Sequence, residues 1–165
     1  MKQITDYQIF TVGYGNRKID DFLKLLKKYQ INLLIDVRSY PFSRFQPAYR
    51  KNLLIQYLNS SDIQYLFMGD SLGGKPKNKE LYIGDKLDYS KVNQNSHYQF
   101  GLQKLKEITT TGIQVALMCS ELDENHCHRK NLIAESLIAT ENFSIHHIDK
   151  KGQLIQHAVF HPNLF

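Results

Sequence analysis

Two cysteines near the end of one predicted strand and the start of the next predicted helix are the most reactive side chains in the sequence. Cys119 ends the apolar run from Val115, and Cys127-His128-Arg129 opens the next helical pattern. A helix N-terminus and a nearby arginine lower the pKa of a thiol and favour a nucleophilic thiolate. The pattern predicts Cys127 as the more reactive thiol and Cys119 as a second candidate. Packing as small buried apolar residues is the competing interpretation.

Two carboxylates accompany these thiols as candidates for acid/base catalysis. Asp36 interrupts the apolar run 33–37, and Glu121 follows Cys119 by two residues. A carboxylate in an apolar run has to be paired, hydrogen-bonded or shifted in pKa. Asp36 is therefore either the partner of Arg38 in a structural pair or a general acid/base. Glu121 is the other acid/base candidate.

Arginines next to predicted strand ends point to an anionic ligand, because the planar guanidinium binds two oxygens of a phosphate at once. The candidate ligand-binding residues are Arg17, Arg38, Ser43, Arg44, His128 and Arg129. Gly13-Tyr14-Gly15 lacks the third glycine of a dinucleotide-binding loop, so a plain strand-to-helix turn is favoured over a phosphate cradle. The thiols and histidines do not form a recognisable metal-ligand pattern, and we assign no metal and no cofactor.

Apolar runs and helical patterns alternate along the chain, which predicts an α/β fold: a single three-layer domain over residues 1–165, with a mainly parallel central sheet flanked by helices. Ligands bind at the carboxyl ends of the strands in such sheets, where the candidate residues fall. The predicted strands are 8–12, 33–37, 63–67, 113–118, 144–148 and 154–157, and the predicted helices are 19–29, 53–58, 97–110 and 127–140.

Residues 69–96 form a long segment rich in glycine, lysine and asparagine, which predicts an irregular loop within the domain. Leu72-Gly73-Gly74-Lys75 contains adjacent glycines, and we predict that it is part of a mobile flap over the strand ends. A surface insertion without a function is the alternative.

The chain has 165 residues, of which 42% are hydrophobic, and a net charge of +5, which excludes disordered and collagen-like chains. Residues 1–51 hold ten Lys or Arg against four Asp or Glu, whereas the remainder holds eleven against twelve. This basic first third favours a phosphate-bearing small molecule or nucleic acid as the partner. The sequence lacks an apolar run of ~20 residues and a signal-peptide pattern, so we expect a cytoplasmic protein with no membrane partner. It carries no indication of oligomeric state.

An ordered set of short motifs resembles one protein family. The set is Thr11-Val12-Gly13-Tyr14-Gly15, Asp36-Val37-Arg38-Ser39-Tyr40-Pro41-x-Ser43-Arg44, Leu72-Gly73-Gly74, Cys119-x-Glu121 and Cys127-His128-Arg129. It resembles the bacterial and archaeal proteins called domain of unknown function 488, over about residues 9–137. The resemblance implies a small cytosolic α/β domain whose signature residues coincide with the candidates above, and it implies no established reaction.

Three functions agree with these observations. The first is an enzyme or binding protein for a phosphorylated or nucleotide-like ligand at the carboxyl edge of the sheet. The second is a nucleic-acid-binding module. It would use the basic first third for backbone contacts and, as stacking surfaces, Tyr14, Tyr40, Phe42, Phe45 and Tyr49. The third is rhodanese-like sulfur transfer through Cys119, although the usual loop in which a cysteine and an arginine cradle an anion is absent.

Overall fold

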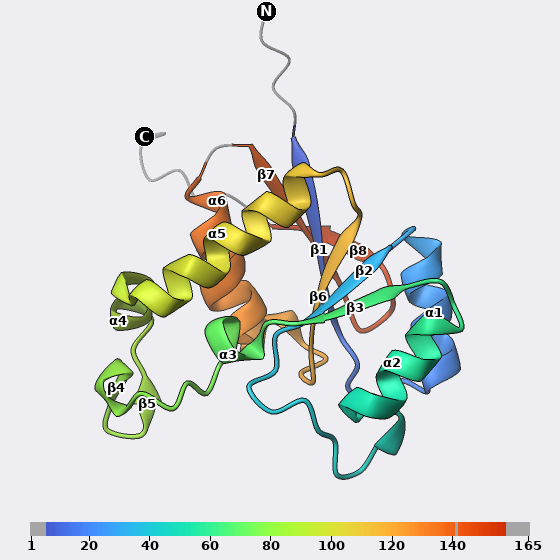
Figure 1. The fold of residues 1–165 in the computed structure, drawn as a ribbon, viewed down its shortest axis with the longest axis horizontal. Coiled ribbons are helices and arrows are strands. Elements are labelled where there is room, and N and C mark those ends of the chain that lie inside the picture. Colours follow the sequence, from blue (N-terminus) through green and yellow to red (C-terminus); the bar gives the residue numbers. More distant parts are fainter. Residues whose placement is uncertain (1–5, 141, 158–165) are drawn as a thin grey trace, which may run out of the picture.

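A computed structural model describes residues 6–140 and 142–157 of the chain. Its centre is a sheet of six strands in the order β3-β2-β6-β1-β7-β8 (Figure 1). The first five strands in this order run parallel, and β8 pairs antiparallel with β7. The strands are β1 (Tyr7–Gly13), β2 (Leu33–Asp36), β3 (Gln64–Phe67), β6 (Val115–Cys119), β7 (Phe143–Ile148) and β8 (Leu154–Gln156).

Helices cover both faces of this sheet, which confirms the predicted three-layer α/β class. In Figure 1, α1 and α2 lie together on one side of the sheet, and α5 and α6 lie on the other. The α-helices are α1 (Ile19–Lys28), α2 (Lys51–Asn59), α3 (Gly69–Leu72), α4 (Tyr89–Gln94), α5 (Ser96–Thr110) and α6 (Glu135–Ile138). The 3-10 helices are η1 (Pro47–Tyr49), η2 (Lys79–Leu81) and η3 (Glu124–His126), and η4 (Arg129–Ala134) is a π-helix.

The central strands are mostly apolar because both of their faces are covered. Every residue of β2 and β6 is buried, as the continuous apolar runs predict for inner parallel strands. Successive side chains point to opposite faces, so Ile35 packs under α5 whereas Leu34 packs under α1 and α2. The edge strand β8 is exposed, as expected for a short antiparallel edge.

Local sequence fixes where the two longest helices begin and end. In α1, Asp20 and Asp21 lie in the first turn and Lys27 and Lys28 in the last, which complements the helix dipole. The α5 helix begins after Asn95, whose side-chain oxygen accepts hydrogen bonds from the amides of two first-turn residues.

The predicted helix 127–140 is divided into the π-helix η4 and the short α6. Both kinds of helix place the apolar residues of so short a segment on the same side, so the sequence pattern does not distinguish them. A π-helix is rare and is often found at functional sites.

Residues 69–96 contain several short elements: α3, η2, the hairpin of β4 (Tyr82–Ile83) and β5 (Lys86–Leu87), and α4. In Figure 1, the hairpin and α4 lie at the outer end of the molecule, next to the beginning of α5. Leu81 and Val92 anchor this segment in the core. Mobility of the segment stays a prediction.

The connections that follow the neighbouring strands β1 and β6 run toward opposite edges of the sheet. From β1 it crosses through α1 to β2, whereas from β6 it crosses the other face through η4 and α6 to β7. Open α/β sheets bind ligands at the carboxyl ends of such strands. Within residues 6–140 and 142–157, none of the helices has both the length and the apolar character that crossing a membrane requires.

Candidate functional site

The two cysteines meet at the carboxyl end of β6. Cys119 is the last residue of the strand, and Cys127 follows η3. The seven residues between them fold back, so that the two Sγ atoms lie 2.6 Å apart. Both thiols are free and buried. Both cysteines therefore lie at the same edge of the sheet.

Arg129 reaches Cys119 from the first turn of η4 and is completely buried. Its Nη1 donates to Cys119 Sγ at 2.8 Å and to the Glu121 carbonyl oxygen at 2.5 Å. Its Nη2 donates to the Leu122 carbonyl oxygen at 3.4 Å, and its Nε donates to Thr11 Oγ1 at 3.3 Å. No carboxylate in the described part of the chain pairs with this guanidinium. A thiolate at Cys119 is therefore the one group in contact with it that can carry a compensating negative charge.

This contact separates the acidities of the two thiols. Burial alone would raise the pKa of Cys119, but hydrogen bonds from Cys127 and Arg129 and the charge of Arg129 outweigh burial and lower it. The hydrogen bond to Cys119, burial and the neighbouring Cys119 charge raise the pKa of Cys127. The structure places the Arg129 guanidinium on Cys119 and not on Cys127, so its contacts favour Cys119 as the more acidic thiol, whereas the sequence pattern favours Cys127.

Asp36 and Arg38 form a buried ion pair at the end of the adjacent strand β2. Arg38 Nε donates to Asp36 Oδ1 at 2.9 Å, and Arg38 Nη2 donates to Oδ2 at 2.7 Å. The Tyr65 hydroxyl also donates to Oδ2 at 2.7 Å, and Arg38 Nη1 donates to the Tyr49 carbonyl oxygen. Burial lowers the pKa of Arg38, but the hydrogen bonds and charge of Asp36 raise it by more, so the pKa lies above its ordinary value. Of the two interpretations of Asp36, this geometry supports the structural pair.

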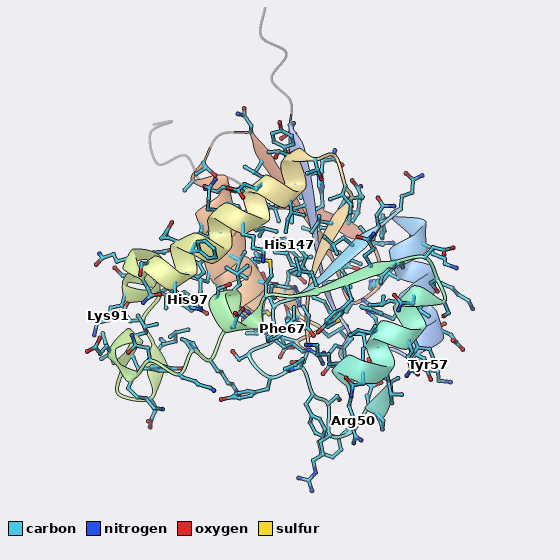
Figure 2. All side chains as sticks on the ribbon, viewed as in Figure 1. Arg50, Tyr57, Phe67, Lys91, His97 and His147 are labelled. Carbon is cyan, nitrogen blue, oxygen red and sulfur yellow. The ribbon has the colours of Figure 1, made fainter. Side chains whose placement is uncertain are left out.

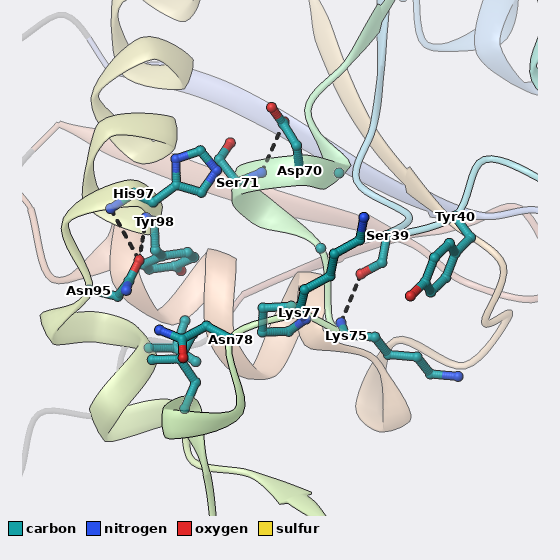
Figure 3. A pocket seen from close by; sticks show the side chains of 15 residues that line it. Ser39, Tyr40, Asp70, Ser71, Lys75, Lys77, Asn78, Asn95, His97 and Tyr98 are labelled. Carbon is teal, nitrogen blue, oxygen red and sulfur yellow. Dashed lines mark hydrogen bonds between the residues drawn. The ribbon is translucent and has the colours of Figure 1, made fainter.

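A cavity of about 460 Å³ opens beside the thiols. Cys119, Cys127 and His128 line it from the sheet edge, and Lys75 and Tyr89 line it from the segment 69–96. A second cavity of about 390 Å³, shown in Figure 3, shares Tyr40 and Lys75 with the first. The backbone amide of Lys75 donates to Ser39 Oγ at 2.8 Å, which ties this segment to the loop after β2.

Close backbone approach at this edge explains two of the glycines. A Cβ atom on Gly13 would lie 1.8 Å from the Glu121 carbonyl oxygen, and one on Gly74 would lie 2.8 Å from His128 Nδ1. The amides of Tyr14 and Gly15 donate to the carbonyls of Cys119 and Ser120, so they are not free to cradle a phosphate. Gly13-Tyr14-Gly15 is thus the packing turn that the sequence favours.

His128 covers the thiols on the side of Gly74. Its Nε2 donates to the Val37 carbonyl oxygen at 3.1 Å, and its Nδ1 lies 3.7 Å from Cys127 Sγ. Burial and the charge of Arg129 lower the pKa of His128 to about 4, against the opposing effect of its carbonyl partners. The imidazole is therefore neutral at pH 7 and binds no anion by charge.

Comparison with known proteins adds a family to this geometry. The chain matches the family described as Domain of unknown function DUF488 over residues 18–137, which is most of its length. It belongs to this family. The match confirms the resemblance found in the motifs. No curated protein and no solved structure matches the chain.

The DUF488 signature residues divide into two groups in space. Arg38, Cys119, Glu121, Cys127 and His128 line the cavity, with Asp36 and Arg129 buried behind it. Ser43 and Arg44 lie on the loop before η1, where Ser43 Oγ accepts the amide of Gln46 and Arg44 stacks on the exposed ring of Phe45. The structure does not bring these last two residues to the cavity.

Three other candidates are held away from any ligand. Arg17 donates to the carbonyl oxygens of Gly13 and Asp149, and burial lowers its pKa. Tyr14 and Tyr49 stack on each other in the core with ring centroids 4.1 Å apart. The prediction that these two rings are stacking surfaces for nucleic acid is wrong, because both are buried by packing that their sequence positions do not reveal.

The sequence pattern does not predict a chain of hydrogen bonds that continues from Arg129 through Thr11 into the core. Thr11 Oγ1 contacts His147 Nδ1 at 2.6 Å, and His147 Nε2 contacts His157 Nδ1 at 2.8 Å. His157 Nε2 then contacts Glu135 Oε1 at 2.9 Å, and the Glu135 side chain is mostly exposed. Figure 2 shows His147 in the interior of the DUF488 domain. Polar residues on the buried strands β1 and β7 were the only indication of this chain in the sequence.

The groups at the two ends of this hydrogen-bond chain limit which of its atoms donate and which accept. Arg129 can only donate to Thr11, and the Glu135 carboxylate can only accept from His157. One arrangement that agrees with both ends has Thr11 Oγ1 donating to His147 Nδ1 and His147 Nε2 donating to His157 Nδ1. Burial, together with the charges of His157 and Arg129, lowers the pKa of His147 to about 3. Among the described residues, no three metal-binding side chains of the DUF488 chain gather at one point.

Proposed function

We propose that the protein is a thiol-dependent enzyme that binds a small anionic ligand at the carboxyl ends of β2 and β6. The ligand bears a phosphate or a similar group and lies in the cavity of about 460 Å³. The Cys119 sulfur forms a bond to an electrophilic centre of that ligand. The proposal places the enzyme in the cytoplasm, where thiols stay reduced.

The observation that carries this proposal is the contact between Arg129 and Cys119. A guanidinium stays protonated in a protein, and this one is buried with carbonyl oxygens, a hydroxyl and one sulfur around it. Ionisation of Cys119 converts a buried uncompensated charge into an ion pair. Arg129 stabilises the nucleophile and does not bind the ligand, because its donors point away from the cavity to these internal partners.

The charge around the cavity supports an anionic ligand. Lys75 lines the cavity with a free ammonium group, since its hydrogen bond to Ser39 uses only the backbone amide. Lys77 lines the adjoining cavity, as Figure 3 shows, and Lys79 lies at a third hollow that shares Lys75. Of these three lysines, Lys75 lines the cavity that contains Cys119, together with Glu121, and Lys77 and Lys79 line the hollows that adjoin it at Lys75.

Alkylation with two matched reagents tests the nucleophile and the charge separately. Iodoacetamide is neutral and iodoacetate is an anion of nearly the same size. We expect both to modify Cys119 at a pH below the ~8.5 of an ordinary thiol, and iodoacetate to be favoured relative to free cysteine. Mass spectrometry of the peptides identifies the modified residue. Inorganic phosphate should slow the reaction.

Reversing one charge provides the control. Lys75→Glu should remove the preference for iodoacetate and leave the rate with iodoacetamide nearly unchanged. Lys104→Glu, on the exposed side of α5, should change neither. A reaction of Cys119 that needs the pH of an ordinary thiol would exclude the nucleophile, and an unchanged preference in Lys75→Glu would exclude this anion site.

A second candidate function, nucleic-acid binding, is favoured by the loop 40–46. Its side chains Tyr40, Phe42 and Phe45 are 60%, 59% and 88% exposed. The Arg44 and Arg50 guanidinium groups lie 5.6 Å and 4.7 Å from the ring centroids of Phe45 and Phe42. Figure 2 shows Arg50 at the periphery of the molecule. Exposed aromatic rings beside arginines are the stacking surface that single-stranded nucleic acid needs.

The dependence of binding affinity on salt concentration distinguishes the two proposed functions. An oligonucleotide that binds through n phosphate contacts loses affinity with a slope of about −0.7n in a plot of log K against log salt. Phe42→Ala and Phe45→Ala should weaken such binding, because each removes a stacking ring. Binding that is unaffected by both variants contradicts this second function and leaves the thiol site unaffected.

A further inference from the structure

We infer that Cys119 and Cys127 form a redox-active dithiol in which a small hydroperoxide oxidises Cys119 and Cys127 then closes a disulfide. The inference shares its nucleophile with the proposed function and goes beyond it, because it assigns a role to Cys127 and names the oxidant. It rests on the positions of two sulfurs, one guanidinium and one cavity.

The first step is favoured by the asymmetry of the pair. The Arg129 guanidinium donates to Cys119 Sγ at 2.8 Å, and none of its hydrogen bonds goes to Cys127 Sγ, which only the backbone amide of Arg129 reaches. With Cys119 as the thiolate, the Cys127 thiol is the donor in the contact between the two sulfurs. Cys119 is the sulfur that reacts first.

In this step the Cys119 thiolate attacks the terminal oxygen of the hydroperoxide. A sulfur–oxygen bond forms, the oxygen–oxygen bond breaks, and an alkoxide or hydroxide leaves and takes a proton from solvent. The product on the protein is a sulfenic acid. Two electrons have passed from sulfur to the peroxide, which becomes an alcohol or water.

In the second step Cys127 resolves the sulfenic acid. Its sulfur attacks Cys119 Sγ, the sulfur–oxygen bond breaks, and hydroxide leaves with the proton of Cys127 as water. The neighbouring sulfur lies 2.6 Å away, so the chain needs no large rearrangement to bring the atoms together. A disulfide is the product.

The same contacts explain why Cys127 is a poor nucleophile until Cys119 has been oxidised. The pKa of Cys127 is raised by the hydrogen bond to Cys119, by burial and by the charge on Cys119, in that order. Conversion of Cys119 to an uncharged sulfenic acid removes the first and the third of these causes, whereas the charge of Arg129 stays and lowers the pKa of Cys127. Oxidation of one thiol therefore activates the other.

Burial selects the size of the oxidant. Cys119 and Cys127 are 3% and 4% exposed, and both face the cavity of about 460 Å³. A protein disulfide cannot align its two sulfurs with a thiolate at that depth. Hydrogen peroxide and small alkyl hydroperoxides fit the cavity and need to present only a terminal oxygen.

The test exposes the reduced full-length protein to hydrogen peroxide and follows it by mass spectrometry without reductant. We expect a loss of two hydrogen atoms and a peptide that links the two cysteines, both reversed by a dithiol. In Cys127→Ser, the sulfenic acid on Cys119 should persist and be trapped by dimedone. In Cys119→Ser, neither product should form at low peroxide.

Matched variants keep the result interpretable. Cys127→Ala repeats the trapping experiment with a side chain that lacks a hydroxyl, and Ser60→Ala, at the exposed position after α2, serves as the neutral control. Thermal unfolding confirms that each variant folds. Direct conversion of Cys119 to sulfinic acid in the wild type without a disulfide would overturn the inference, as would equal oxidation of Cys127 in Cys119→Ser.

The outcome is independent of the alkylation experiment. A disulfide without a preference for iodoacetate leaves the dithiol in place and removes the anionic ligand. A preference for iodoacetate without a disulfide removes the dithiol and leaves the proposed function.

Discussion

Two arginines lie at the same edge of the sheet and are both buried, yet their surroundings differ in kind. Arg38, after β2, shares two hydrogen bonds with the carboxylate of Asp36. Arg129, after β6, has carbonyl oxygens, one hydroxyl and one thiol, and no carboxylate among the described residues. The charge of Arg38 is neutralised by Asp36, whereas no carboxylate among the described residues neutralises the charge of Arg129.

The difference separates a structural role from a chemical one. The Asp36 carboxylate accepts from Arg38 and from Tyr65, so it is engaged on both oxygens and holds the loop that leads to the cavity. The charge of Arg129 is available to an anion that forms beside it, and Cys119 is the group placed to become that anion. Burial of a charged side chain alone therefore does not indicate reactivity; the identity of its partner does.

Removing the carboxylate of the neutralised pair should have the largest effect. Asp36→Ala leaves Arg38 buried without a counter-charge, which typically costs about 3–5 kcal/mol of unfolding free energy. Urea unfolding measures this loss. Arg44→Ala, on the exposed loop, should stay within about 0.5 kcal/mol of the wild type. Equal stabilities of the two variants would contradict the structural role of the pair.

Removing the charge of the second arginine should act on the thiol. Arg129→Met keeps an apolar stem and removes the guanidinium that stabilises the Cys119 thiolate. We expect the midpoint of Cys119 alkylation to move upward to at least the ~8.5 of an ordinary thiol. Arg129→Lys keeps the charge and should move the midpoint less. A midpoint that is the same in all three proteins would show that Arg129 does not control the thiol.

Acid should weaken the region around Arg129 through two histidines. Folding lowers the pKa of His128 to about 4 and that of His147 to about 3, from an ordinary value near 6.5. Their contribution to stability is therefore complete above pH ~6.5 and is lost as the pH falls below it. Each proton taken up on unfolding gives a slope of about 1.4 kcal/mol per pH unit.

His147→Gln checks this dependence. This variant removes one of the two groups that take up a proton on unfolding. The fall in unfolding free energy between pH 6 and pH 4 should therefore be shallower by about 1.4 kcal/mol per pH unit at most. A slope that matches that of the wild type would show that His147 is not held neutral by its surroundings.

The smallest effect is expected at the surface end of the hydrogen-bond chain. Glu135→Gln removes the negative charge that accepts from His157. The charge is exposed and far along the hydrogen-bond chain from Cys119. Since removing a negative charge favours a thiolate, the alkylation midpoint should fall, by only a few tenths of a pH unit. Glu107→Gln, on the exposed face of α5, should have no effect. A shift as large as that of Arg129→Met would contradict the ranking.

Much of the fold follows from local pattern. The apolar runs of β2 and β6 and the three-and-four spacing in α1 are repeated properties of neighbouring residues, so their strands and helix are predicted to within a few positions. Asp36 and Arg38 are two residues apart, which makes their pairing predictable as well. Membership of the family follows from motifs that are also local.

The rest depends on contacts between distant segments. Which thiol Arg129 meets is decided by how the connection between β6 and η4 folds back, and no residue in it specifies that choice. Thr11 and His147 are far apart in the sequence and meet because β1 pairs with β7. Tyr14 and Tyr49 stack in the core for the same kind of reason, because they are far apart in the sequence.

The missing carboxylate beside Arg129 has a consequence for how the sequence can change. A chain under selection for stability alone would gain by placing an acidic residue against this guanidinium, as Asp36 lies against Arg38. Cys119→Asp is the substitution that would do so, and it would end thiol chemistry. Under the proposed function, stability is given up at this point for activity, as in other proteins where stability and function compete.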